Sequence, residues 1–235
     1  MHDYYSAILW STSNPEWHFD LAALYSHRIW NCDSLIALFT QTEILLAIRQ
    51  MDSNSAPSPD GFGPGFYQAA WGTISSDVML MMQSFHANEA DLEQINRAYI
   101  VLIPKPRKEN TPDGYRPISL QNCLVKIIAK ALANRLQMVL PKLIDADQIG
   151  FLKGRSISEN FIYASELIQC CHKRKLPTAI VKLDFAKAFD SVTWISLLEI
   201  LRVRGFPELW CSWISTLLFI LIKHVLPSNK RMRQL

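Results

Sequence analysis

The stretch Ala179-Ile-Val-Lys-Leu-Asp-Phe-Ala-Lys-Ala-Phe-Asp-Ser-Val192 decides how the rest of the chain is interpreted. Its first five residues are mostly apolar or β-branched, which predicts a short strand. The strand runs into Asp184, and an acid where a strand gives way to a turn is well placed to hold a divalent cation. Two plainer interpretations stay open: Asp184 as an ordinary turn residue, and Asp190 as the N-cap of the next helix.

The charges of the chain are unevenly distributed. Residues 1–96 carry a net charge of −9, residues 97–155 carry +7 and residues 156–235 carry +5. A basic block beside an isolated acid suits a polyanionic partner, with the acid reserved for metal. An ordinary solvated surface explains the same charges. Hydrophobic residues make up 49% of the 235 positions, which argues against wholesale disorder.

Cysteine spacing and the apolar runs exclude several classes of protein. The five cysteines form no CxxC pair and lack the second half of a zinc site, so reduced thiols in an intracellular protein are expected, with the nucleus as one candidate compartment. The N-terminus lacks the basic and apolar regions of a signal peptide. The apolar run 209–222 is shorter than the roughly 20 residues that span a bilayer, which favours a core helix over a membrane segment.

Apolar periodicity and capping residues indicate a helix-rich chain. The segment 56–65, rich in proline and glycine, predicts an ordered loop that is either plain punctuation or a source of backbone N–H groups for a phosphate chain. Helices are predicted over residues 41–51, 66–87 (as one helix or two), 123–140, 158–172, 193–204 and 207–222.

Two predicted strands, 98–103 and 116–120, flank a basic loop. The loop begins with Lys105, and Arg116 opens the returning strand. A β-hairpin tipped with lysine and arginine suits a triphosphate or a nucleic-acid backbone, because the arginine fork grips two phosphate oxygens at once. A solvated loop is the plainer alternative.

Five segments in a fixed order now resemble the reverse transcriptase domain of non-LTR retrotransposons, the plant LINE type in particular. The resemblance runs from about residue 40 to residue 215 and implies an α+β fold: the fingers and partial palm of a right-hand polymerase, helix-rich, with a short antiparallel β-hairpin and an incomplete palm sheet. The segments are Ala56-Pro-Ser-Pro-Asp-Gly-Phe62, Leu102-Ile-Pro-Lys105, Tyr115-Arg-Pro-Ile-Ser-Leu120, Gln148-Ile-Gly-Phe151 with Gly154-Arg155, and Lys182-Leu-Asp-Phe-Ala-Lys-Ala-Phe-Asp190.

The resemblance also implies roles for single residues. Asp184 is expected to be the first catalytic, metal-binding carboxylate, and Mg²⁺ the metal, with a pair of ions used in catalysis. Phe185 is expected to lend its backbone to the metal and triphosphate site, and Phe189 to select deoxynucleotides by clashing with a 2′-hydroxyl. Lys105 and Arg116 are expected to contact the incoming nucleoside triphosphate.

The expected partners are an RNA template, a DNA primer and a dNTP. Gln148, Gly150 and Arg155 belong to the segment that the resemblance places along template and primer. The chain is expected to divide into an aromatic-rich helical extension (1–39), fingers and upper palm (40–176), palm (177–218) and a divergent tail (219–235).

One departure from the family is clear. The family needs three carboxylates, of which two come from an adjacent pair of aspartates, and this chain has no Asp-Asp pair and no aspartate after Asp190. A truncated and inactive polymerase is therefore expected. A non-catalytic nucleic-acid-binding remnant is the alternative, and a membrane-associated fragment held by residues 209–222 is a third hypothesis.

Overall fold

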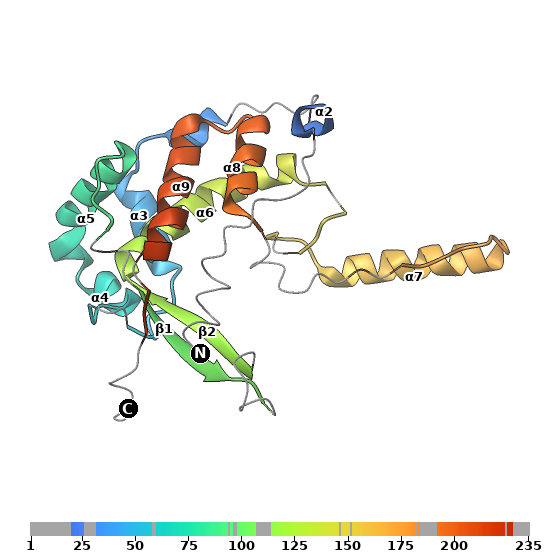
Figure 1. Ribbon diagram of the computed structural model, residues 1–235, viewed down its shortest axis with the longest axis horizontal. Coiled ribbons are helices and arrows are strands. Elements are labelled where there is room, and N and C mark those ends of the chain that lie inside the picture. Colours follow the sequence, from blue (N-terminus) through green and yellow to red (C-terminus); the bar gives the residue numbers. More distant parts are fainter. Residues whose placement is uncertain are drawn as a thin grey trace. The chain divides into compact units, whose positions relative to one another are not determined.

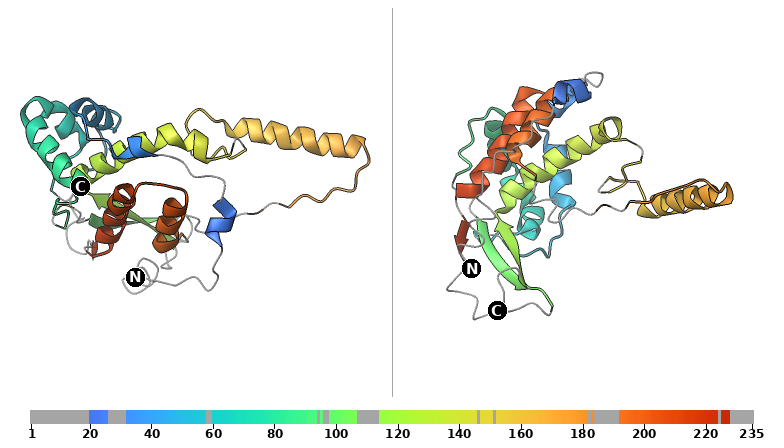
Figure 2. Two further views of the ribbon diagram at one scale, coloured as in Figure 1. Left: turned by 90° about the horizontal axis from the view of Figure 1, so that it is seen from above. Right: turned by 45° about the vertical axis from the view of Figure 1, so that its right-hand side comes forward.

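The computed structural model describes residues 20–25, 32–57, 60–93, 95, 98–106, 114–145, 147–150, 152–181, 183, 192–223 and 225–227. The chain divides into two compact units, of which the first comprises residues 1–132 and 190–235 and the second residues 133–189. Helices predominate in the described residues and a small sheet accompanies them, so the predicted α+β class is confirmed at this level (Figures 1 and 2).

The helices of the first unit follow the predicted pattern closely. Thr40 accepts a hydrogen bond from the Glu43 N–H at 3.2 Å and so caps α3, as expected of a threonine at this position. Gly205 has φ +82° just after α8, which is the left-handed conformation that ends many helices. The helices are α2 (Leu21–Tyr25), the 3₁₀ turn η1 (Asp33–Ile36), α3 (Gln41–Arg49), α4 (Pro64–Ala69), α5 (Trp71–His86), α8 (Trp194–Val203) and α9 (Glu208–Lys223).

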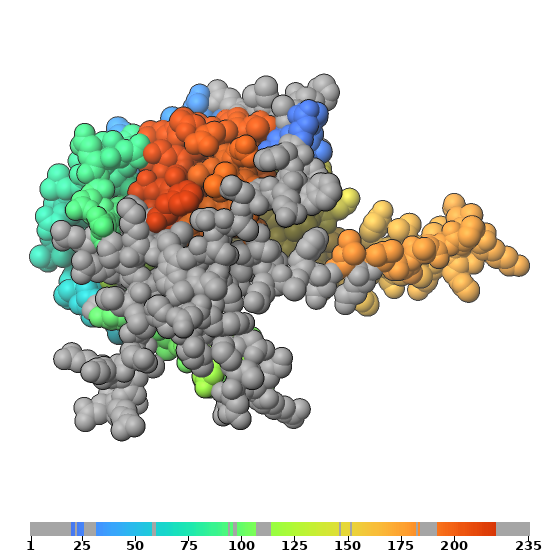
Figure 3. Space-filling view, in the orientation of Figure 1, coloured from blue at the N-terminus to red at the C-terminus, as the bar shows by residue number. Residues whose placement is uncertain are grey.

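The core of this unit is aromatic and lies between α5 and α9, which are side by side in the space-filling view (Figure 3). The fully buried ring of Trp213 lies 5.6 Å from that of Phe39 and 5.5 Å from that of Phe85, centroid to centroid. Its indole N–H donates to the backbone oxygen of His86 at 3.3 Å. The run 209–222 is thus part of a core helix, as predicted. Within the described ranges, no helix combines the length and the apolar character needed to cross a bilayer.

The sheet confirms the predicted hairpin and adds one strand. β1 (Ala98–Pro104) and β2 (Tyr115–Gln121) are antiparallel, with Ile103 opposite Arg116. β3 (Val225–Pro227) pairs in parallel with β1, which gives the order β2-β1-β3. The third strand comes from the segment that we expected to be a divergent tail.

The helix α6 (Cys123–Leu143) begins where the sequence predicted, directly after Asn122. It continues through Pro141, at which an end was predicted, because a proline in the last turn removes only one intrahelical hydrogen bond. Asn122 is buried, and within the described residues its side-chain oxygen has no hydrogen-bond partner. Asn122 therefore stands at the N-cap position of α6 by its backbone, whose oxygen accepts from the Lys126 N–H at 3.2 Å, and its side-chain oxygen makes no capping bond.

The second unit contains α7 (Ile157–Lys173) and corrects one expectation. Residues 179–181 and 183, predicted as the strand leading to Asp184, have no regular structure, and Ile180, Val181 and Leu183 are 67%, 76% and 76% exposed. The expected palm strand is thus absent from the described part of this stretch. A strand needs a neighbour to pair its backbone groups, and the described residues of this unit include no strand.

Candidate nucleotide and nucleic-acid interface

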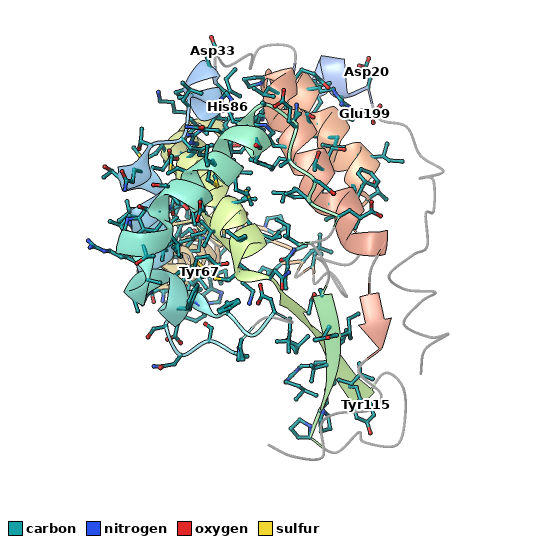
Figure 4. The ribbon with its side chains drawn as sticks, turned by 90° about the vertical axis from the view of Figure 1, so that its left-hand side faces the viewer. Asp20, Asp33, Tyr67, His86, Tyr115 and Glu199 are labelled. Atoms are coloured by element: carbon teal, nitrogen blue, oxygen red, sulfur yellow. The ribbon has the colours of Figure 1, made fainter. Side chains whose placement is uncertain are left out.

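Lys105 and Arg116 lie at the same end of the β1–β2 hairpin. The Lys105 N–H donates to the backbone oxygen of Gly114 at 2.7 Å, which extends the ladder one step past the last strand pair, Pro104 and Tyr115. Arg116 is the next residue along β2 and is exposed. Figure 4 shows Tyr115 out on the hairpin, whereas Tyr67 lies among the helices. The structure therefore places at one end of the hairpin the two cations that the resemblance assigned to one nucleotide site.

One face of the hairpin combines apolar side chains with a cation. Tyr99 pairs with Leu120, Val101 with Ile118, and Ile103 with Arg116. Because directly opposed residues project from the same face, these six side chains share it. Three of the apolar side chains on this face are exposed: Tyr99, Ile103 and Ile118. Such a surface can contact bases or sugars through its apolar part and a phosphate through its arginine.

The carboxylate of Asp60 is near enough to the beginning of α6 to influence a thiol there, a proximity that the sequence did not signal. Burial raises the pKa of the Cys123 thiol to about 11, the nearby Lys126 opposes this shift, and the charge of Asp60 adds to it. Burial, with Cys123 and Asp60 as smaller causes, raises the pKa of the Tyr67 hydroxyl to about 12. Both groups are neutral at pH 7, so neither is an activated nucleophile.

The segment after α6 is organised by Arg155. Its guanidinium donates to the backbone oxygens of Asp145 (2.5 Å), Ile144 (3.4 Å) and Gln148. The described contacts of Arg155 therefore hold a turn together, a role that differs from the nucleic-acid contact that the resemblance implies. Gln148 is exposed and Gly150 is half-buried in the same turn.

The remaining predicted site residues, Asp184, Phe185 and Phe189, lie outside the described residues, as does Asp190. In the described part of the chain, no three histidine, cysteine, aspartate or glutamate side chains gather as a metal site would require. The structure therefore positions the hairpin cations but gives no geometry for the expected carboxylate.

Comparisons with known proteins now decide the family. The model described as "Reverse transcriptase (RNA-dependent DNA polymerase)" matches residues 103–234, which is more than half of the chain. The chain belongs to the reverse transcriptase family. This match covers both the hairpin cations and Asp184. Together with the three relatives that follow, it confirms the resemblance to the reverse transcriptase domain of non-LTR retrotransposons.

Three relatives show the same affiliation. This reverse transcriptase chain is 31% identical over 179 residues to the "Transposon TX1 uncharacterized 149 kDa protein" of Xenopus laevis, covering 76% of the chain. It is 29% identical over 174 residues, 74% of the chain, to the "Retrovirus-related Pol polyprotein from type-2 retrotransposable element R2DM" of Drosophila melanogaster. The type-1 element R1 Pol polyprotein of Bradysia coprophila is 25% identical over 179 residues, 73% of the chain.

The aligned part makes up only 14%, 16% and 17% of the length of these three relatives. Reverse transcriptases as a family use a divalent metal and bind a nucleic-acid template and primer. The structure does not position such a metal, because Asp184 lies outside the residues that it describes.

Proposed function

We propose that this chain supplies the nucleotide-binding and template-binding part of an RNA-directed DNA polymerase of a non-LTR retrotransposon. The observation that carries the proposal is the position of Lys105 and Arg116 at one end of the hairpin, inside the segment that matches the family. An exposed arginine beside an apolar strand face suits a nucleoside triphosphate, whose phosphates need cations and whose base and sugar accept apolar contact.

Each residue then has a distinct task. Arg116 would grip phosphate oxygens with its planar fork, and Lys105 would add a point charge beside it. Phe189 would exclude a 2′-hydroxyl, and Phe185 would offer backbone groups to the triphosphate. Asp184 would hold Mg²⁺, which when bound activates the primer 3′-hydroxyl and steadies the departing pyrophosphate.

The chain by itself is proposed to be inactive as a polymerase. Two metal ions about 3.5–4 Å apart require several carboxylates, and this chain has no Asp-Asp pair to add to Asp184. Primer extension on poly(rA)/oligo(dT) with Mg²⁺ or Mn²⁺ is expected to give only background incorporation. Incorporation that disappears in Asp184→Ala would overturn the proposed inactivity.

Nucleotide binding is tested independently of catalysis. Ultraviolet cross-linking of radiolabelled dTTP to the full chain is expected to fall severalfold in Arg116→Gln and in Lys105→Gln. Lys142→Gln removes an equivalent charge from an exposed position on α6 and is the matched control. Equal labelling of all four proteins would contradict the assignment of the site to the hairpin.

The second candidate function is a non-catalytic nucleic-acid-binding remnant, which the net charge of +7 over residues 97–155 favours. RNA binding that weakens steeply with salt is expected from several phosphate contacts. RNA binding without any dTTP cross-linking would support this candidate over the first.

A further inference from the structure

The C-terminal end of α7 carries four consecutive cationic or titratable residues that none of the segments resembling the family includes. They are His172, Lys173, Arg174 and Lys175, and all four are exposed. We call residues 172–175 the basic cap. Within the described part of the chain, neither lysine nor Arg174 forms an ion pair. All three cations are exposed, so an outside partner can reach them.

The backbone at this helix end adopts a conformation that ordinarily favours glycine. The Leu176 N–H donates to the Cys171 oxygen at 3.0 Å and the Lys175 N–H to the His172 oxygen at 3.1 Å. This pair of hydrogen bonds is the Schellman motif, in which the residue directly after the C-cap adopts the left-handed conformation. Lys175 has φ +53° there, although a residue with a Cβ is strained in that region.

Two other helix ends of the same chain show what is usual. After α8 the same two bonds form, from Gly205 to Arg202 at 2.9 Å and from Phe206 to Leu201 at 3.0 Å. Gly205 has φ +82° and thus adopts the conformation without a steric penalty. After α5 the equivalent position holds an asparagine, the next best residue. Only α7, of these three, places a long cation there.

We propose that the basic cap binds the phosphate backbone of single-stranded RNA, as a contact separate from the hairpin. This inference rests on the proposed nucleic-acid binding and adds a surface to it. The helix dipole explains basic residues in the last turn, but it does not explain a lysine at a strained position beyond the helix. Three adjacent cations leaving a helix end match the charge of consecutive phosphates, and they read no base edge.

The test uses the full chain and a fluorescein-labelled oligouridylate, with anisotropy followed over a series of KCl concentrations. Lys175→Gly is informative because glycine suits this backbone better, so its melting temperature should equal or exceed that of the wild type. The slope of log affinity against log salt should become shallower by roughly 0.7 in Lys175→Gly, and by about 2 when Lys173→Gln and Arg174→Gln are added. Arg49→Gln, an exposed cation in the last turn of α3, should leave the slope unchanged.

The outcomes separate this inference from the proposed function. A wild-type slope in the triple variant, with binding weakened by Arg116→Gln, would overturn the basic-cap contact and leave the proposed function intact. Absence of oligouridylate binding in the wild type would overturn both. Competition by polyglutamate as strong as that by unlabelled oligouridylate would also refute the inference, because the cap would then select negative charge and not a phosphate backbone.

Discussion

Arg155 offers the sharpest test of structure against resemblance, because the two assign it different partners. The resemblance places it along template and primer, whereas its guanidinium donates to three backbone oxygens of residues 144–148. A hydrogen bond from a charged donor contributes about 1.5–3 kcal/mol when it is buried. One of the three bonds is long, at 3.4 Å, and the turn is largely exposed, so we expect Arg155→Lys to lower the free energy of unfolding by about 2–3 kcal/mol in total.

A lysine keeps the charge but cannot reach three carbonyl groups with its single ammonium. If the role is structural, Arg155→Lys melts earlier, and hydrogen exchange quickens at the amide of Gln148, which donates to the Asp145 oxygen at 3.2 Å. Its salt slope for RNA binding should match that of the wild type. Lys153→Gln, an exposed charge in the same segment, is the control for stability. An Arg155→Lys variant with wild-type stability and exchange would refute this reasoning.

Three further predictions concern stability and reactivity. Trp213→Ala should lower the free energy of unfolding by about 3–5 kcal/mol, measured by urea denaturation, because a fully buried indole leaves a cavity. Gly65→Ala should lower the free energy of unfolding by about 1–2 kcal/mol, because the added Cβ would lie 3.0 Å from a backbone oxygen. Gly72→Ala should raise it by about 0.5–1 kcal/mol, because no atom lies within 4 Å of the added Cβ. The opposite order of urea midpoints would contradict both expectations. Burial raises the pKa of the Cys123 thiol from 9.0 to about 11, so its stabilising effect is complete below pH 9 and lost as the pH rises toward 11. Cys123→Ala should therefore flatten the alkaline decline in stability by about 1 kcal/mol after solvent screening, and iodoacetamide at pH 8 should label exposed Cys170 while sparing Cys123, as mass spectrometry of the digested protein would show.

The elements that could be predicted are those specified by neighbouring residues. Thr40 caps α3 and Gly205 ends α8 because side-chain and backbone preferences act within four residues. The hairpin could be predicted equally well, since its two strands are close in sequence and its prolines exclude a helix. Lys105 and Arg116 came together for the same local reason.

Features that depend on distant partners could not be predicted. The pairing of Val225 with Ala98 joins strands far apart in the sequence, and no local pattern announces it. The position of Asp60 beside the start of α6 likewise depends on tertiary packing. Arg155 has the residue type of a phosphate ligand, but only coordinates reveal that backbone oxygens occupy its guanidinium.

The segment before Asp184 shows why a correct residue pattern still needs a structural partner. Ile180 and Val181 have strong strand propensity, yet they are exposed and irregular, because propensity cannot supply the backbone hydrogen bonds of a neighbouring strand. Catalytic groups must be held within about 0.5 Å of their productive positions. The described residues before Asp184 have no such pairing, whereas Arg116 lies in a strand that is paired along its whole length. The proposed phosphate binding by the hairpin can therefore be tested separately from the proposed metal binding by Asp184, because the hairpin consists of paired, described strands.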